Sequence, residues 1–426
     1  MSIMFSVLIP AYNRADYLYY TLLTCAQQQF SNVEFIIQDD CSTDNTYLVV
    51  NNFVLSDRRF KYFTNDSNKG MLQNFETGLN NCQGQYFICL GSDDGLMPGA
   101  LERLEKILSS KKCDILTWPT SAFFYSGTKT IYPQLVLPHD MFKRKFLIKK
   151  RSLEFLNRQA KKVFYIGDNE CPMLYIKSVV SRKLIEKVKS LSGGKFYCCS
   201  TPDGYSAFAL ASVSDFFIYT NDSFTIHGVS PNSAGLNYVQ GGNVGGDLSD
   251  KFFSDSKSIP MSKSLGAADY SPLITLMTAD FIYKTDEIFN HQISHKLNIR
   301  HVIKNSIMEV CDGLMADEKV TRELKIIKKI AIYHDCLEYF EELVRKTPRN
   351  SRRALNADAI SPRLLYLNCD TRGISNLFLA SVFVNKKLNS RKIYFQLNLF
   401  KTLANSLYYF ILSFVPQKKI NEYYSL

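Results

Sequence analysis

Short apolar runs alternate with amphipathic stretches along the first hundred residues of the chain. Four apolar runs, each short enough to be a strand, cover residues 5–9, 33–38, 60–64 and 86–90. Three stretches with apolar residues at helical spacing separate them, from residue 16 to about 29, from 44 to 53 and from 72 to 82. This alternation predicts an α/β fold with a mostly parallel sheet, flanked by helices that form right-handed crossovers.

Polar residues directly follow three of the four apolar runs, in loops at residues 10–14, 39–42 and 92–94. Because the carboxyl ends of parallel strands meet at one edge of a sheet, we expect these loops to converge on one ligand. A carboxylate in the second loop can accept hydrogen bonds from a nucleotide base or ribose. The ring of Tyr12 in the first loop can stack on a base.

Two adjacent carboxylates, Asp93 and Asp94, follow the fourth apolar run. Carboxylates side by side repel each other unless a cation neutralises them. Oxygen ligands favour Mg²⁺ or Mn²⁺, which commonly bridge a carboxylate to substrate phosphates. Taken alone, the pair also fits a polar turn that caps the next helix, because Asp is a common turn and N-cap residue.

The net charge and the absent motifs narrow the class of ligand, and the cysteines indicate the redox environment. The formal net charge is +11 and the pI is about 8.9, which favours anionic partners. We expect no nucleic acid among them, since the chain has no recognition motif for one. No P-loop or G-x-G-x-x-G motif follows the first run. The 11 cysteines form no C-x-x-C motif, which predicts free thiols in a reducing cytosol.

In order and spacing, the first 105 or so residues resemble the family 2 glycosyltransferases, which have the GT-A fold. The motifs that carry the resemblance are Val-Leu-Ile-Pro-Ala-Tyr-Asn-Arg at 7–14, Ile-Ile-Gln-Asp-Asp-Cys-Ser-Thr-Asp-Asn-Thr at 36–46, Asn-Lys-Gly at 68–70, Gly-Gln-Tyr-Phe at 84–87 and Leu-Gly-Ser-Asp-Asp at 90–94. The resemblance weakens to about residue 235 and is absent beyond. It implies inverting transfer of a sugar from a nucleotide-diphosphate sugar.

The resemblance also implies roles for residues of this chain. The donor nucleotide would contact Pro10, Ala11, Tyr12, Arg14, Asp39, Asp40, Asn68, Lys69, Ser92 and Asp93. A Mn²⁺ or Mg²⁺ cofactor would be held by Asp93, Asp94 and His227. Many members have D-x-D here, and Gly91 replaces the first Asp. The remaining pair can still hold a metal, because Mg²⁺ needs only one or two carboxylates besides phosphate and water.

The acceptor hydroxyl needs a general base, and an acidic residue just before a helix usually supplies it in this family. Asp203 fits, since an apolar stretch at residues 205–211 reads as that helix. The alternative is a structural turn, because Pro-Asp-Gly forms one by chemistry alone. Asp168 and Glu170 are the next candidates for the base, and with Asn169 they are predicted to bind the acceptor or the donor sugar.

The remainder of the chain predicts a division into three regions. Residues 1–235 would form the catalytic domain, the glycine-rich residues 236–265 a flexible linker, and residues 266–426 a helical C-terminal region. Apolar residues at helical spacing between residues 324 and 344 indicate two or more helices that pack on each other or on the catalytic domain.

From residue 386 the tail has seven basic residues and one acidic residue among aromatic and aliphatic ones. This composition is typical of a helix at a membrane interface, and residues 141–151 form a second basic and aromatic patch. A core helix or a dimer interface would explain the tail equally well.

These observations predict a cytoplasmic glycosyltransferase of surface polysaccharide synthesis. They are compatible with a peripheral position on the inner face of the cell membrane and with a homo-oligomer. Its acceptor would be a glycan, held on a lipid diphosphate. A protein that binds a nucleotide sugar without turnover is a second reading, which Gly91 motivates. A nucleotidyltransferase is a third, although such sheets usually have a glycine-rich basic loop after the first strand.

Overall fold

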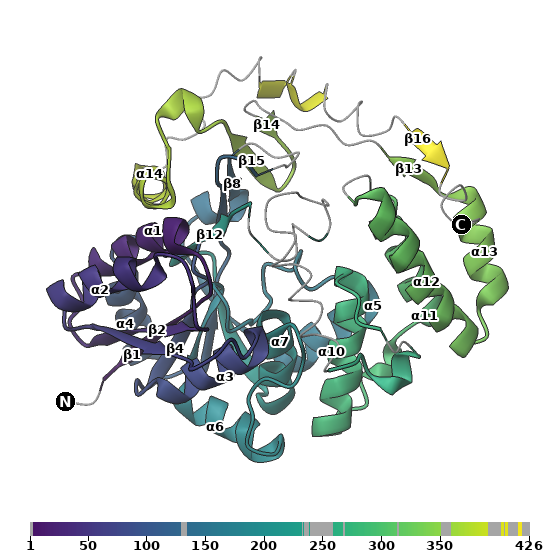
Figure 1. The fold of residues 1–426 in the computed structure, drawn as a ribbon, viewed down its shortest axis with the longest axis horizontal. Coiled ribbons are helices and arrows are strands. Elements are labelled where there is room, and N and C mark those ends of the chain that lie inside the picture. The colour runs from purple at the N-terminus through teal and green to yellow at the C-terminus, as the bar shows by residue number, and fades with distance from the viewer. Residues whose placement is uncertain are drawn as a thin grey trace.

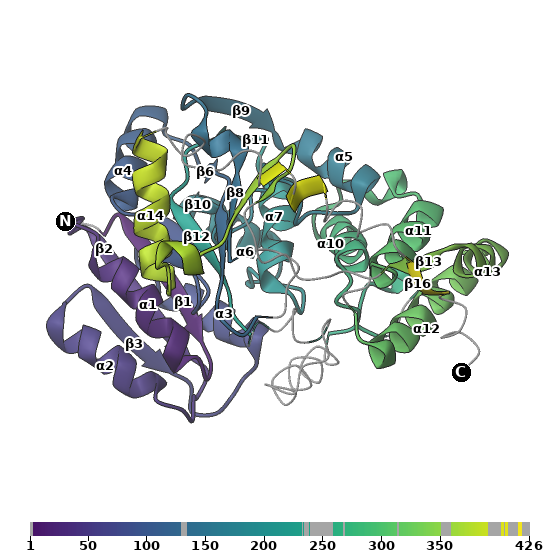
Figure 2. The same cartoon turned by 90° about the horizontal axis from the view of Figure 1, so that it is seen from above.

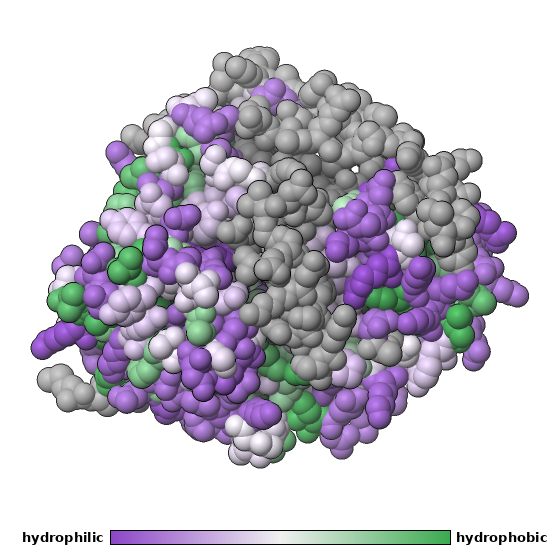
Figure 3. Space-filling view, in the orientation of Figure 1, coloured by the Kyte–Doolittle hydropathy of each residue, from purple (hydrophilic) through white to green (hydrophobic). Residues whose placement is uncertain are grey.

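The chain is described by a computed structural model at residues 3–128, 134–231, 233, 238, 259–266, 269–312, 315–350, 359–390, 402–403, 405–407 and 416–419. Most of the predicted linker at 236–265 and most of the tail beyond residue 390 lie outside these residues. Hydrophilic side chains dominate the described surface in Figure 3, with apolar ones scattered among them.

An eight-stranded sheet forms the centre of the N-terminal half (Figure 1). Its order is β3 (Phe60–Thr64), β2 (Val33–Asp39), β1 (Phe5–Ala11), β4 (Tyr86–Cys89), β10 (Ser178–Ser181), β6 (Ile115–Thr117), β11 (Phe216–Thr220) and β9 (Leu147–Arg151). The first four strands are parallel, and β1 and β2 are buried along their whole length. The predicted α/β fold and its four strands are therefore confirmed.

Helices connect and cover these strands. They are α1 (Ala15–Ala26), α2 (Thr46–Ser56), α3 (Met71–Asn81), α4 (Ala100–Lys111), α5 (Ser152–Lys162), α6 (Arg182–Leu191) and α7 (Pro202–Val213). In Figure 1, α1 lies above the strands and α3 and α6 lie below them. α2 begins at Thr46, two residues later than the predicted start at residue 44. Asp44 lies in the loop before the helix, where its Oδ1 accepts the Thr46 N–H at 2.9 Å.

A second sheet brings distant parts of the chain against the Asp93–Asp94 turn. Its order is β14 (Ala359–Ile360), β15 (Leu364–Leu367), β8 (Leu135–Pro138), β7 (Ser121–Phe124), β12 (Thr225–Val229) and β5 (Gly95–Leu96). Because β5 follows Asp94 directly and pairs with β12, His227 is placed beside the two carboxylates. α14 (Leu377–Ser390) packs against α1 and β5, so the C-terminal region also contacts the N-terminal part (Figure 2).

Four helices of the C-terminal region lie on the right in Figure 1, away from α1 and α2. They are α10 (Ile274–Phe289), α11 (Ile299–Val310), α12 (Asp317–Tyr333) and α13 (Leu337–Lys346). α10 packs against α7, which is apolar all round and buried at every position except Asp203. The helical pattern at 324–344 covers parts of two helices, α12 and α13, and the chain turns between them at Asp335, which adopts φ +53°. Two short strands, β13 (Pro348–Asn350) and β16 (Pro416–Lys419), pair beyond them.

Among the described residues, no helix combines the length and the apolar composition that crossing a membrane requires.

Candidate active site

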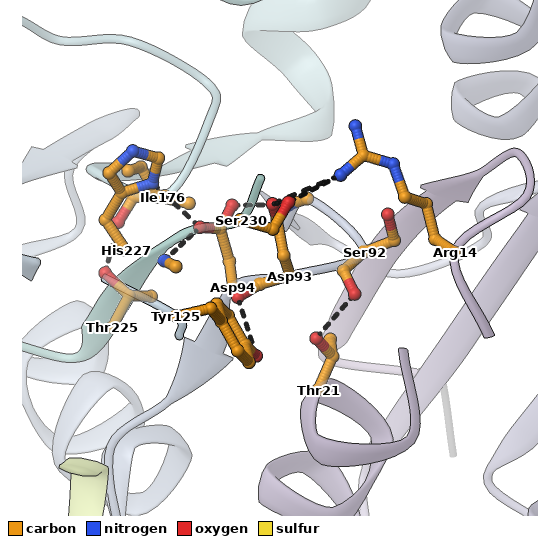
Figure 4. Close-up of polar contacts among 12 residues, drawn as sticks. Arg14, Thr21, Ser92, Asp93, Asp94, Tyr125, Ile176, Thr225, His227 and Ser230 are labelled. Carbon is orange, nitrogen blue, oxygen red and sulfur yellow. Dashed lines mark hydrogen bonds and ion pairs between the residues drawn. The ribbon is translucent and has the colours of Figure 1, made fainter. Parts of the chain in front are cut away.

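Asp94 lies at the centre of a hydrogen-bonded cluster in the turn between β4 and β5 (Figure 4). Its side chain is fully buried. Oδ2 accepts the Gly91 N–H at 2.7 Å, and Oδ1 accepts the Gly228 N–H at 2.8 Å and lies 2.8 Å from His227 Nδ1. Because protein groups contact both oxygens of this buried side chain, Asp94 positions its neighbours, and its predicted role as a metal ligand stays a prediction.

Asp93 has one oxygen tied to the protein and one oxygen free. Oδ2 accepts the Ser230 hydroxyl at 2.6 Å and lies 3.4 Å from Arg14 Nη1, which itself donates to Ser230 at 2.7 Å. Oδ1 accepts no hydrogen bond from any described residue, and 12% of the side chain is exposed. Burial raises the pKa of Asp93, the Arg14 charge opposes this, and the Asp94 charge adds to it. Asp93 Oδ1 is therefore available to a cation.

His227 completes the cluster from β12. Nδ1 faces Asp94, while the other ring nitrogen points away from the carboxylates, and 37% of the side chain is exposed (Figure 4). Burial alone would lower the pKa of His227, but the charge and hydrogen bond of Asp94 raise it above its usual range. The contact with Asp94 fixes the ring orientation, as a carboxylate does for metal-binding histidines.

Gly228 is required by the close approach of β12 to the carboxylate pair. A Cβ at this position would lie 1.6 Å from the Asp93 carbonyl oxygen. The Tyr125 hydroxyl lies 3.5 Å from the same carbonyl oxygen, and Thr21 of α1 donates to the Ser92 carbonyl at 3.0 Å. The turn is thus fixed from three sides before any ligand binds.

The residues present fit a divalent cation, although the described residues contain no ready group of three metal-ligating side chains. Asp93 Oδ1 and the outward nitrogen of His227 are the two donors that face away from the protein. A cation that keeps several waters and binds substrate phosphates needs no more protein ligands than these.

The first two loops are tied together beside this cluster. Asn13, which adopts φ +50°, accepts the Thr43 N–H at 2.8 Å and donates its own N–H to Ser42 at 2.8 Å. Arg14 follows directly and reaches Asp93. Pro10 and Ala11 lie buried at the end of β1. The convergence of loops predicted from the strand ends is therefore observed for the first, second and fourth strands.

Asp39 and Asp40 lie at the same sheet edge, but both are buried and bonded within the protein. Asp39 accepts the Tyr62 hydroxyl at 2.7 Å and the Ser42 N–H at 3.2 Å. Asp40 is the acceptor for the loop before α3, which includes Asn68 and Lys69. Its partners are Asn65 Nδ2 at 2.8 Å, Lys69 N at 2.7 Å, Gly70 N at 2.9 Å and, at its carbonyl, Asn68 Nδ2 at 3.2 Å.

Asp203 occupies the first turn of α7 and is half-buried. Its Oδ1 accepts the Gly204 N–H at 2.7 Å. Burial raises its pKa, two backbone N–H groups lower it, and the charges of His227 and Asp94 also act on it. The charges of the Asp94–His227 cluster therefore reach Asp203, and its role as the general base stays a prediction.

Asp168 and Glu170 form an ion-pair network away from that cluster. Asp168 Oδ2 accepts Arg158 Nε at 2.7 Å and Gln159 Nε2 at 2.8 Å. Glu170 lies 2.8 Å from Lys150 Nζ and 3.3 Å from Arg158 Nη2. Asn169 between them is exposed. With both carboxylates paired, the structure supports a role in holding β9 and α5 rather than a role in proton transfer.

The glycosyl transferase family 2 model matches residues 6–170. Those residues form a family 2 glycosyltransferase domain. The predicted family is confirmed, and the domain contains Arg14, Asp93 and Asp94, while His227 and Asp203 lie beyond the match.

Curated relatives match the same region of the chain. An uncharacterised glycosyltransferase of Haemophilus influenzae is 38% identical over 104 residues, which is 24% of this chain and 40% of that protein. A GalNAc(5)-diNAcBac-PP-undecaprenol beta-1,3-glucosyltransferase of Campylobacter jejuni is 38% identical over 100 residues, 23% and 32% of the two chains. The aligned part of this chain thus spans less than half the length of these relatives.

Solved structures resemble a longer part of the chain at low identity. Staphylococcus aureus TarS 1–349 is 15% identical with a TM-score of 0.45, over 80% of this chain and 90% of that one. A mannosyltransferase from Pyrobaculum calidifontis, in complex with GDP-Man and Mn²⁺, is 13% identical with a TM-score of 0.38, over 80% and 86%.

Proposed function

We propose that this protein transfers a sugar from a nucleotide-diphosphate sugar to a hydroxyl of a glycan acceptor, with inversion at the anomeric carbon. One observation carries the proposal: Asp93 and Arg14 of the family 2 domain meet His227, from beyond the family match, at the carboxyl edge of the sheet around the buried Asp94. This edge is where α/β sheets bind ligands.

The diphosphate would bind against Asp93, His227 and Arg14. A Mn²⁺ or Mg²⁺ ion held by Asp93 and His227 would supply neutralisation of the charge that develops on the leaving diphosphate. Arg14 adds a fixed positive charge beside Asp93. Asp94 holds the imidazole of His227, and the donor contacts of Pro10, Ala11, Tyr12 and Ser92 would come from the same edge.

Asp203 would act as the general base. Its carboxylate would take the proton of the acceptor hydroxyl while that oxygen attacks the anomeric carbon. The bond between this carbon and the phosphate oxygen breaks in the same step, and the nucleoside diphosphate leaves. The raised pKa of Asp203 favours this role, since a base with a pKa nearer the working pH holds a proton more readily.

A lipid-linked glycan of surface polysaccharide synthesis is the acceptor we propose. Two relatives support it by name, the Campylobacter jejuni enzyme and an Escherichia coli UDP-Glc:alpha-D-GlcNAc-diphosphoundecaprenol beta-1,3-glucosyltransferase, which is 36% identical over 89 residues. Such an acceptor requires contact with the inner face of the cell membrane, and the basic tail from residue 386 is one candidate for it.

An exposed sheet face supports membrane contact independently of that tail. The paired strands β9 and β11 place Leu147, Lys149, Arg151 and Phe216 on one face, and all four are exposed. Lys149 Nζ lies 3.9 Å from the centre of the Phe216 ring. Basic and apolar side chains together suit an anionic lipid surface.

Binding without turnover is the second candidate, because Gly91 leaves the site one carboxylate short of D-x-D. Incubation with a panel of nucleotide sugars, Mn²⁺ and a glycan acceptor linked to undecaprenyl diphosphate separates the two. Release of nucleoside diphosphate in the wild type, and its loss in Asp203→Asn with donor binding retained, supports transfer. Donor binding with no release in either protein supports the binding role, and no donor binding contradicts both.

A further inference from the structure

The hydroxyl of Tyr175 occupies the space that a side chain at residue 91 would fill. A Cβ built on Gly91 would lie 2.3 Å from the Tyr175 oxygen and 2.7 Å from Asp94 Oδ2. The same Cβ would lie 3.1 Å from Asp93 Oδ1. An aspartate therefore cannot be accommodated at residue 91 while Tyr175 keeps its position. The absence of the first carboxylate and the presence of the tyrosine hydroxyl thus depend on each other.

A strained turn holds Tyr175 at this point. Ile176 adopts φ +50°, which is rare for a β-branched residue, and donates its N–H to the Cys89 carbonyl at 2.8 Å. The Lys177 N–H donates a hydrogen bond to the Tyr175 carbonyl at 2.6 Å. Trp118 Nε1 donates to the Ile176 carbonyl at 3.0 Å. These contacts fix the turn against the end of β4, where the Asp93–Asp94 turn begins.

Tyr175 is a neutral hydrogen-bond donor beside several carboxylates. Burial raises its pKa well above the usual range, and the charges of Asp94, Asp93 and Asp203 raise it further. The hydroxyl makes no hydrogen bond to any described residue, although the side chain is only half-buried. A protonated phenol in this position has its O–H available for a ligand.

We propose that the Tyr175 hydroxyl takes the place of the missing carboxylate and donates a hydrogen bond to a phosphate oxygen of a bound nucleoside diphosphate. This inference rests on the proposed function. A phosphate is the ligand group expected there, because the hydroxyl lies within about 5.5 Å of Asp93 Oδ1, the oxygen open to a cation. A phenol can donate to a phosphate, which a carboxylate cannot do.

The direct test is the affinity of Tyr175→Phe for nucleoside diphosphates. Isothermal titration with UDP, GDP, CDP and ADP in Mn²⁺ identifies the nucleotide that the wild type binds most tightly. We expect Tyr175→Phe to bind it about 10-fold or more weakly, the loss typical of a hydrogen bond to a charged group. The nucleoside monophosphate serves as a second ligand, and we expect it to lose much less.

Tyr86→Phe is the matched control, since it removes a partly exposed phenol at the opposite end of β4. Equal diphosphate affinity in the wild type, Tyr175→Phe and Tyr86→Phe would overturn the inference and leave the proposed function intact. Equal losses for monophosphate and diphosphate in Tyr175→Phe would also overturn it. A wild type that binds none of the nucleotides would overturn the proposed function and this inference with it.

A double variant tests the steric side of the inference. Gly91→Asp alone should lose diphosphate affinity, because its Cβ cannot coexist with the Tyr175 hydroxyl. Gly91→Asp with Tyr175→Ala should recover Mn²⁺-dependent affinity above that of either single variant. If Gly91→Asp binds as well as the wild type, or the second substitution gives no recovery, the tyrosine does not replace the carboxylate.

Discussion

His227 Nδ1 lies 2.8 Å from Asp94 Oδ1, and this contact joins the eight-stranded sheet to the six-stranded sheet. Asp94 belongs to the turn after β4 of the first sheet, while His227 belongs to β12 of the second. The adjacent Gly228 N–H donates to the same oxygen. A buried carboxylate with three such partners sets the orientation of a ring that is itself partly exposed.

We expect Asp94→Asn to weaken Mn²⁺ binding by about 10- to 100-fold, the usual effect of losing a group that orients a metal ligand. The Asn side chain cannot accept from Gly91, Gly228 and His227 in the same way. Titration of Mn²⁺ in the presence of the preferred nucleoside diphosphate measures the effect. Unchanged Mn²⁺ affinity in a folded Asp94→Asn protein would remove His227 from the metal site.

Asp203→Asn should lower kcat by about 100-fold or more while donor affinity stays the same. Since burial raises the pKa of Asp203, the loss of activity on acidification should begin at a higher pH than for an ordinary aspartate. A pH–rate profile of the wild type shows this acid limb, and the residual activity of Asp203→Asn should lack it. Near-normal turnover would assign the base to another residue.

Glu309 makes stability depend on pH. It accepts the Ile274 and Thr275 N–H groups at the start of α10, and burial raises its pKa from 4.5 to about 7 despite them. Between these values the folded protein holds the proton more tightly than the unfolded chain. Protonation of Glu309 therefore contributes about 3 kcal/mol to the free energy of unfolding. This stabilisation is fully present below about pH 4.5 and is lost as the pH rises through about 7.

Denaturant unfolding of the wild type and of Glu309→Gln across this pH range measures that contribution. The glutamine does not titrate. Its single amide oxygen can accept only one of the two N–H groups, which adds a loss of stability that does not depend on pH. As the pH rises, we expect the unfolding free energy of the variant to increase relative to that of the wild type. A difference that stays constant across the range would contradict the raised pKa of Glu309.

Lys149→Glu with Arg151→Glu should weaken binding to vesicles of phosphatidylcholine and phosphatidylglycerol, and added salt should weaken the wild type in the same assay. Lys106→Glu with Lys111→Glu on α4 is the control, because it makes the same charge change at exposed residues elsewhere. Equal losses in both variants would show only a net-charge effect. No sedimentation of the wild type would contradict membrane contact.

The strands were predictable because the apolar runs are short and helical stretches separate them, although β1 continues through Pro10 to Ala11 and β2 through Asp39. β1 ends before the turn at Asn13, and β4 ends before Gly91. The position of the break between α12 and α13 was not predictable, since Asp335 carries the positive φ and no glycine marks the position. Helical spacing continues through residues 324–344 as if the chain were straight.

The sequence also indicated which residues would meet at the site, but not what each would do there. The convergence of Arg14 and Asp93 follows from strand order and spacing, while His227 was expected there only from the family resemblance. The partners that bury Asp40 come from the loop at 65–70, and those that pair Asp168 come from α5. Tyr175 was missed, because its approach to Gly91 joins residues more than eighty positions apart and leaves no local pattern.

Donor binding by Asp93→Asn is the most direct test of the central claim that this edge of the sheet holds a cation and a nucleotide-diphosphate sugar. Isothermal titration of the wild type with nucleotide sugars, with and without Mn²⁺, gives the reference. We predict Mn²⁺-dependent binding of one donor in the wild type, and loss of that dependence in Asp93→Asn. Equal binding by both proteins, with or without Mn²⁺, would contradict the account.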